Sequence, residues 1–252
     1  MRATIVQLSD PHLFGDPQAQ HRDVTTAASF AAVVAHARRV APDCDAVVLT
    51  GDLCHDPSPE GYEAVRQTLG EWLDRTLVIA GNHDDLHMLG AVFGRPEANG
   101  DAVCFRSLIG DGDWQLIGVD SVVPGETHGW LDEEQLQQLD AWLAEDPARP
   151  TLLFLHHPPI ALGSAWLDPL LLRNPEQLAG RLPGSGVRAM FCGHAHTDQT
   201  GELAGIPVHV TPSTAFQFVM SGQSISIDPS PPGFRVIRID DDRLATEVVR
   251  LA

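Results

Sequence analysis

The sequence predicts an α/β fold, because short apolar runs typical of strands alternate with helical patterns along most of the chain. The strand-like runs cover residues 4–10, 46–52, 76–84, 114–121, 151–159, 187–196, 206–212 and 234–240. The 252 residues, 43% of them hydrophobic, are enough to bury the core of one large domain.

Helical patterns separate the early strands, and each begins with a recognisable start signal. They cover residues 23–40, 58–73 and 131–146. Asp23 is a candidate cap of the first, and Ser58 followed by Pro59 is a favourable start for the second. The third has acidic residues in its first turn and leucines at helical spacing. After residue 206 the strands are less interrupted by helices, and residues 221–234 form a loop-rich stretch.

Charge and composition limit the location and the partners of the protein. A formal net charge of -18 repels nucleic acid polymers, anionic membranes and small phosphate esters, unless a site carries its own cations. No run of about 18 apolar residues occurs, and the N-terminus lacks the pattern of a signal peptide. The scattered Cys44, Cys54, Cys104 and Cys192 are expected to be reduced thiols. We therefore expect a cytoplasmic protein.

Five strand-like runs end in side chains that bind metals or protons. These residues are Asp10 and His12, Asp52, Asn82 and His83, His156 and His157, and His194 and His196. In α/β folds, ligands bind at the carboxyl ends of the strands. One such end would be compatible with a capping Asp and an unrelated His. Five in series have no structural reason, so we predict a functional site.

The donor set indicates the kind of site. Imidazoles and carboxylates suit zinc, manganese and iron, and the absence of thiolate ligands argues against a structural zinc finger. The candidate ligands are Asp10, His12, Asp52, Asn82, His156, His194 and His196. They exceed the four ligands of one tetrahedral zinc and suit two ions about 3.5–4 Å apart. Asp52 is the natural bridging ligand because its strand lies between the others in sequence order. The neutral Asn82 would leave its ion more Lewis acidic than a carboxylate would.

The ordered motifs "DPH", "GD", "GNHD", "HH" and "GHAH", within residues 4–196, resemble those of the calcineurin-like metallophosphoesterase superfamily. The resemblance implies a central β-sandwich flanked by α-helices, in four layers ordered α/β/β/α. It also implies a single domain over residues 1–252, in which strands between residues 206 and 252 complete the sandwich.

The resemblance also implies a role for each candidate residue. One ion would be held by Asp10, His12, Asp52 and His196, and the other by Asp52, Asn82, His156 and His194. His83 would be the catalytic histidine, outside the ligand set. The substrate would contact His12, Asp52, Asn82, His83 and His196. The ions would be two divalent transition metals among iron, manganese and zinc, with manganese or an iron–manganese pair favoured.

Three further stretches, "GSAWLDPLLLRN", "TPSTAFQF" and "PPGFRVI", are similar to the bacterial class III 3',5'-cyclic AMP phosphodiesterases of this superfamily. The implied reaction opens 3',5'-cyclic AMP to 5'-AMP by attack of a metal-bridging hydroxide. The implied partner is a small-molecule phosphodiester, with no nucleic acid polymer and no membrane, and a homodimer is kept open.

Two other functions stay open. "HHPPIALGSAWLDP" is also similar to bacterial glycerophosphodiesterases, so other small diesters are an alternative substrate. A metal-bound scaffold without catalysis is the other alternative, although a scaffold would not need His83. Protein serine/threonine phosphatases carry an Arg after GDxxD, and "GDLCHDPS" has none, which argues against phosphoprotein substrates.

Substrate chemistry suggests roles for a few more side chains. The departing 3'-alkoxide is a poor leaving group, so we expect His83 to protonate it. Asp84 or Asp56 is a candidate to orient the His83 ring, and spacing alone does not choose between them. Trp166 or Phe216 is a candidate to stack on the adenine.

The remaining histidines have weaker claims to the site. His21, His87 and His128 lie in loop-like or helix-start stretches and are expected at the surface. His55 is expected to be solvated or to lie behind a ligand. Strand alternation is expected to direct His157 away from the ions, although His156 beside it is a ligand candidate.

Overall fold

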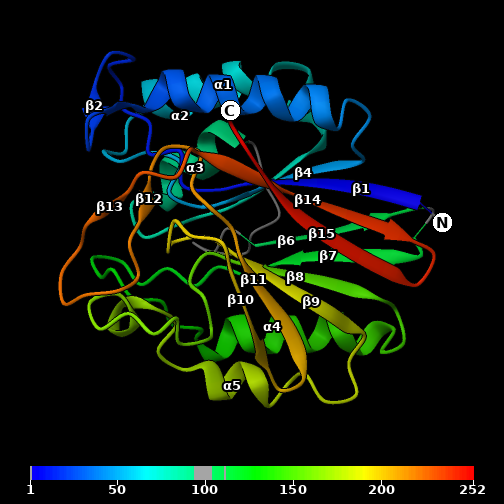
Figure 1. Cartoon of the computed structure of the whole chain (residues 1–252). Helices are drawn as coiled ribbons and strands as arrows, with labels where there is room; N and C mark the ends of the chain where they lie inside the picture. Colours follow the sequence, from blue (N-terminus) through cyan, green and yellow to red (C-terminus); the bar gives the residue numbers. More distant parts are fainter. Residues whose placement is uncertain (1, 94–103, 111) are drawn as a thin grey trace.

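The computed structural model describes residues 2–93, 104–110 and 112–252, in which two mixed β-sheets face each other and helices cover the outer face of each (Figure 1). The first sheet contains β1 (Arg2–Leu8), β4 (Ala46–Thr50), β5 (Thr76–Ile79), β14 (Gly233–Asp240) and β15 (Arg243–Arg250). Their order across the sheet is β15, β14, β1, β4, β5. The pairs β1–β4 and β4–β5 are parallel, whereas β14 runs antiparallel to β1.

The second sheet contains β6 (Phe105–Ile109), β7 (Trp114–Gly118), β8 (Thr151–Leu155), β9 (Val187–Cys192), β10 (Gln199–Leu203) and β11 (Ile206–Val210). Their order is β10, β11, β9, β8, β7, β6, with parallel pairing from β7 through β8 and β9 to β11. Two short hairpins, β2 (Gln20–His21) with β3 (Val24–Thr25) and β12 (Gln217–Phe218) with β13 (Ile227–Asp228), lie outside both sheets.

Three helices cover the first sheet and two cover the second (Figure 1). The first group is α1 (Thr26–Val40), α2 (Pro59–Leu69) and α3 (Leu86–Phe93), and the second is α4 (Glu133–Glu145) and α5 (Pro175–Ala179). Short 3-10 helices cover Gly70–Arg75 and Asp168–Leu170. The predicted four-layer α/β/β/α fold is confirmed.

Strand alternation explains the layers. On β4, Val47 and Leu49 pack against the helices, whereas Val48 points between the sheets, where it meets Phe154 and Phe191 of the second sheet. Both faces of the central strands are therefore apolar, as expected for strands covered on both sides. Leu8 and Thr50 end β1 and β4, so the polar residues that follow them lie in loops at the sheet edge.

The helix starts agree with the prediction in two cases and differ in one. The Ser58 hydroxyl accepts a hydrogen bond from the Gly61 amide at 3.1 Å, and Asp132 forms a capping box at the start of α4. Asp23 does not cap α1, which begins after Thr25. Asp23 instead lies in the turn between β2 and β3, with φ 64°. The residue predicted to cap α1 is therefore part of the hairpin turn that precedes the helix.

The sequence prediction also missed strands β6, β10 and β15, which form three of the four sheet edges. Edge strands with one exposed face are mixed in polarity, as β15 shows by its alternation of exposed and half-buried residues. Among the described residues, none of the helices has the length and apolar character needed to cross a membrane.

Candidate metal centre

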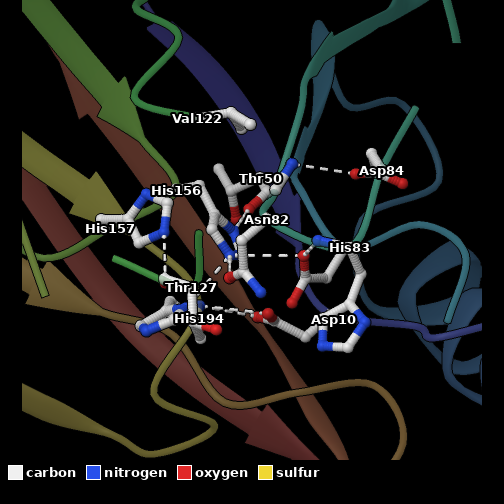
Figure 2. A network of polar contacts seen from close by, with 12 residues as sticks. Asp10, Thr50, Asn82, His83, Asp84, Val122, Thr127, His156, His157 and His194 are labelled. Carbon is white, nitrogen blue, oxygen red and sulfur yellow. Dashed lines mark hydrogen bonds and ion pairs between the residues drawn. The ribbon is translucent and has the colours of Figure 1, made fainter. Parts of the chain in front are cut away.

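The candidate ligands meet at one edge of the sandwich, where the carboxyl ends of parallel strands from both sheets lie together. The loops after β1, β4 and β5 contribute Asp10, His12, Asp52 and Asn82, and the loops after β8 and β9 contribute His156, His194 and His196. Figure 2 shows Asp10, Asn82, His156 and His194 directed toward a common centre. The structure thus brings together all seven side chains that the sequence indicated.

One half of the centre is formed around His12. Its Nε2 lies 3.0 Å from Nε2 of His196 and 3.6 Å from Oδ2 of Asp52. Nε2 of His196 lies 3.5 Å from Oδ1 of Asp10. All four side chains are buried, and Asp10, His12 and His196 form a group whose ligand atoms lie within 4.8 Å of one another.

The other half is formed around His156. Its Nε2 lies 3.2 Å from Oδ1 of Asn82, 3.3 Å from Nδ1 of His194 and 3.5 Å from Oδ1 of Asp52. Asp52 therefore directs one carboxylate oxygen at each half, which is the geometry of a bridging ligand. The bridging role itself stays a prediction.

Hydrogen bonds on the far side of two rings determine what the centre can bind. Nδ1 of His156 lies 2.7 Å from the carbonyl oxygen of Thr50, and Nδ1 of His196 lies 2.9 Å from that of Phe216. Carbonyls only accept, so both Nδ1 atoms carry a proton and each Nε2 is the nitrogen directed at the centre. When Nε2 is unprotonated, its lone pair faces the oxygens of Asp10, Asp52 and Asn82. The residues therefore fit divalent cations, which would satisfy these converging acceptors.

Backbone strain is concentrated in the same residues. Asp10, His12, Asp52, His194 and His196 all have positive φ, between 46° and 68°. This conformation is uncommon outside glycine and costs about 1–3 kcal/mol per residue. Five of the seven candidate ligands thus have a backbone conformation that their residue types rarely adopt. Such strain is typical of functional sites, where the surrounding structure and not local propensity determines the backbone conformation.

Glycines next to the ligands permit close approach. A Cβ on Gly81 would lie 2.2 Å from Oδ1 of Asp52, and a Cβ on Gly193 would lie 2.8 Å from Oδ2 of Asp10. The motifs "GNHD" and "GHAH" thus begin with glycine because any side chain there would collide with a carboxylate of the centre.

Charge states in the metal-free protein follow from burial and from Asp52. Burial lowers the pKa of His194 to about 3 and holds that of His12 well below its usual range. Burial would also lower the pKa of His156, but the Asp52 carboxylate raises it to about 9. The proton on His156 occupies the place of a cation, so an ion that binds there displaces it.

His83 lies at the rim of the centre. Its amide donates to Oδ1 of Asp52 at 2.9 Å, and its Nδ1 lies 3.3 Å from the carbonyl oxygen of His55. The ring is therefore oriented by a backbone carbonyl, and neither Asp84 nor Asp56 takes the role that spacing suggested for one of them.

Asp84 holds two loops together instead. Its buried carboxylate accepts from the amides of Leu53, Cys54 and Gly81 at 2.9–3.2 Å and from the hydroxyl of Tyr62 at 3.2 Å. In Figure 2 the Asp84 side chain is directed away from the ring of His83. Asp84 thus fixes the loop that carries Asp52 against the loop that carries His83. Burial raises its pKa to about 6, which the Asp52 charge reinforces.

His157 has both ring nitrogens engaged away from the ions. Nδ1 lies 2.8 Å from the Ser121 hydroxyl. Nε2 lies 3.1 Å from the carbonyl oxygen of Thr127 (Figure 2). Its ring packs against that of His194, with centroids 4.6 Å apart. His157 therefore supports a ligand candidate and fastens the loop after β7.

Phe216 is not available for stacking on a base. It is 3% exposed and packs against the rings of His12 and His196, with centroids 5.9 and 4.8 Å away. Trp166 is half-buried, and its indole N–H donates to the Val219 carbonyl at 3.4 Å. Trp166 makes an edge contact with Phe218, which in turn stacks on His196, so Trp166 is separated from the centre by the ring of Phe218.

His21 is half-buried and contacts His55, a contact that the sequence analysis missed. The rings of His21 and His55 lie 4.0 Å apart, and those of His55 and His83 lie 4.7 Å apart, so the three form a stacked row. His21 reaches this row from the β2–β3 hairpin, whereas His55 follows Asp52 in the chain. The hint in the sequence was His55, two residues beyond the "GDL" motif; no local pattern indicated His21.

Comparisons with known proteins identify the family of the chain. The family model of the calcineurin-like phosphoesterases matches residues 3–198. The 3',5'-cyclic adenosine monophosphate phosphodiesterase CpdA of Haemophilus influenzae is 36% identical over 98% of this chain and 89% of its own length. CpdA of Escherichia coli K12 is 34% identical over 100% and 90%. The 3',5'-cyclic-nucleotide phosphodiesterase alr5338 of Nostoc is 31% identical over 95% and 88%.

Solved structures share the fold at low identity. A dimetal phosphatase from Danio rerio superposes with a TM-score of 0.68 at 16% identity, over 98% of this chain and 95% of that one. The yellow lupin purple acid phosphatase PPD1 gives 0.72 at 15% identity, over 99% of this chain and 52% of that one. The fold and the site define a metallophosphoesterase. The chain belongs to the calcineurin-like phosphoesterase family.

Proposed function

We propose that the protein is a dinuclear metal-dependent phosphodiesterase that hydrolyses 3',5'-cyclic AMP to 5'-AMP. The observation that carries the chemistry is the convergence of potential ligand atoms from seven side chains beside His83. The substrate rests on the relatives of nearly full length, which are named as cyclic AMP phosphodiesterases.

The proposed ligand sets follow the two halves of the centre. Asp10, His12, Asp52 and His196 would hold one ion, and Asp52, Asn82, His156 and His194 the other. Manganese or an iron–manganese pair suits this mixture of imidazole, carboxylate and amide. When bound, the two ions would supply positive charge for the phosphate oxygens and lower the pKa of a bound water. They would also offset the repulsion between an acidic protein and an anionic substrate.

The side chains of the protein would complete the reaction. Oδ1 of Asn82 faces His156, which leaves its amide N–H groups free to donate to a phosphate oxygen. Nδ1 of His83 is satisfied by the His55 carbonyl, so Nε2 is the atom that would give a proton to the departing 3'-oxygen. Protonation offsets the high energy of an alkoxide leaving group, and the phosphate stays on the 5' carbon.

The decisive experiment compares substrates and identifies the product. Manganese-loaded protein is incubated with 3',5'-cyclic AMP and, separately, with glycerophosphodiesters. We expect 5'-AMP and a higher kcat/KM for the cyclic nucleotide. Formation of 3'-AMP would contradict the proposed direction of attack. A much higher kcat/KM for the glycerophosphodiesters would favour the small-diester alternative, which the stretch "HHPPIALGSAWLDP" supports. No turnover of any diester would favour a metal-bound scaffold.

A further inference from the structure

A second group of metal-binding atoms lies on the outer side of the candidate centre. His55 is half-buried, and its ring lies between those of His21 and His83. One ring nitrogen from each of His12, His55 and His83 lies within 4.8 Å of the others. We name these three residues the outer triad.

Ring spacing in the outer triad matches that of the inner ligand pairs. The centroids lie 5.0 Å apart for His12 and His83, 5.5 Å for His12 and His55, and 4.7 Å for His55 and His83. Two imidazoles on one tetrahedral ion, with metal–nitrogen distances of about 2.1 Å, place their centroids about 5 Å apart. The inner pair His12–His196 has a separation of 5.0 Å. The outer triad therefore already has the spacing of an ion site.

The nitrogens of the triad are also short of partners. Nδ1 of His12 and Nδ1 of His55 are buried without a hydrogen-bond partner, two of the eight such side-chain atoms in the described part of the chain. Leaving a buried polar atom unpaired costs about 1–3 kcal/mol. Nδ1 of His83 faces the His55 carbonyl, so Nε2 is the nitrogen that could bind an ion. A cation on the triad would satisfy these atoms.

We propose that the outer triad is a third, inhibitory site for a zinc-type ion. Imidazole ligands favour zinc, cobalt and copper over calcium and magnesium, so the site is selective for borderline transition ions. His12 cannot serve an inner and an outer ion through its two nitrogens without losing its ring proton. An outer ion therefore draws His12 away from the inner ion, which keeps Asp10, Asp52 and His196, and it also occupies His83. Inhibition, unlike binding, rests on the proposed function, because it assumes that both residues serve hydrolysis.

Equilibrium dialysis against zinc tests the binding directly, with hydrolysis rates measured in parallel. We expect the wild-type protein to take up a further zinc ion beyond the inner pair and to lose activity as it does so. His55→Gln should bind one ion fewer, and the zinc concentration for half inhibition, relative to its own uninhibited rate, should rise at least about tenfold. His87→Gln is the matched control, since His87 is exposed on α3, and should behave as the wild type.

A second variant separates ligation from packing. His55→Phe keeps an aromatic ring between His21 and His83 but removes both ring nitrogens. It should therefore also bind one zinc ion fewer than the wild type, and this result stands if His55→Gln folds poorly. An unchanged number of bound zinc ions in both His55 variants would overturn the proposal, as would the loss of the same ion in His87→Gln. Ion counting does not depend on the substrate. A protein inactive on cyclic AMP would thus refute the proposed function while the dialysis still decides the site.

Discussion

The two sheets contribute different chemistry to the same centre. The first sheet supplies every carboxylate and the amide, from Asp10, Asp52 and Asn82, together with His12 and His83. The second sheet supplies imidazoles alone, from His156, His194 and His196. The negative charge that attracts cations thus lies on one side, and the neutral ligands that complete each half come from the other.

Two hydrogen bonds fasten the sheets together at this edge. Nδ1 of His156 donates to the Thr50 carbonyl at 2.7 Å, and the His194 amide contacts both oxygens of Asp10 at 3.1 Å. Neither sheet alone has a complete ligand set for either of the two proposed ions. The comparison implies that ion binding and the packing of the two sheets stabilise each other.

Asp52→Ala should have the largest effect, because it removes the side chain that faces both halves. We expect kcat to fall by about 10⁴-fold or more, since several kcal/mol of charge stabilisation would be lost. Asn82→Ala removes a neutral ligand from one half and should cost less. Full metal content and activity in Asp52→Ala would refute the bridging assignment.

His83→Ala should come next, because it removes a proton donor and leaves the ligands in place. On a diester with an alkyl leaving group, kcat should fall by about 10²–10⁴-fold. With a p-nitrophenyl diester the loss should be smaller, because that leaving group needs no proton. Equal losses on the two substrates would show that His83 does not act as a leaving-group acid.

Asp84→Asn tests the support beneath the first sheet's loops. An amide of the same shape would turn one N–H toward the backbone amides that the carboxylate now accepts from. We expect ion affinity to fall by about 10–100-fold, as is typical for residues that orient ligands. Asp43→Asn, an exposed control, should leave ion affinity unchanged. Isothermal titration with manganese measures both variants.

Substitution of Asp120, in the loop after β7 of the second sheet, should have the smallest effect, a pH-dependent change in the stability of the metal-free protein. Burial raises the pKa of Asp120 to about 7, although a hydrogen bond from the Val122 amide at 2.8 Å acts to lower it. A folded pKa above the unfolded value means that the contribution to stability is full below about pH 4 and is lost as pH rises through about 7. Asp120→Asn should therefore stabilise the metal-free protein by about 1–4 kcal/mol at pH 8.

The same substitution should have a much smaller effect at pH 4, where Asp120 is neutral in the folded state and close to half neutral in the unfolded state. Melting temperatures at the two pH values measure the difference, and Asp43→Asn again serves as the exposed control. An equal shift at both pH values would show that the effect of Asp120→Asn does not come from ionisation.

The sequence was most informative where a buried strand leads into a loop that holds candidate ligands. The buried strands β4 and β8 read as continuous apolar runs, and the ligand candidates follow them directly. The orientation of His83 could not be predicted, because the atom that receives its ring proton is the backbone carbonyl of His55. Sequence letters do not show backbone carbonyls.

Contacts between loops that are distant in the chain could not be predicted from the sequence either. His21 reaches His55 through a hairpin turn in which Arg22 and Asp23 have positive φ. Arg rarely adopts this conformation, and the sequence favoured Asp23 as a helix cap. Phe216 was proposed to stack on the base, yet it is buried against His12 and His196. Burial of an aromatic ring depends on the packing of both sheets and so required the structure.

Two ions should share Asp52 between the two sheets. Manganese-loaded protein should contain two ions per chain by metal analysis, and its low-temperature electron paramagnetic resonance spectrum should show an exchange-coupled pair. In Asp52→Ala, the coupled signal should disappear. One manganese ion per chain, or two ions with uncoupled spectra in the wild type, would contradict the claim.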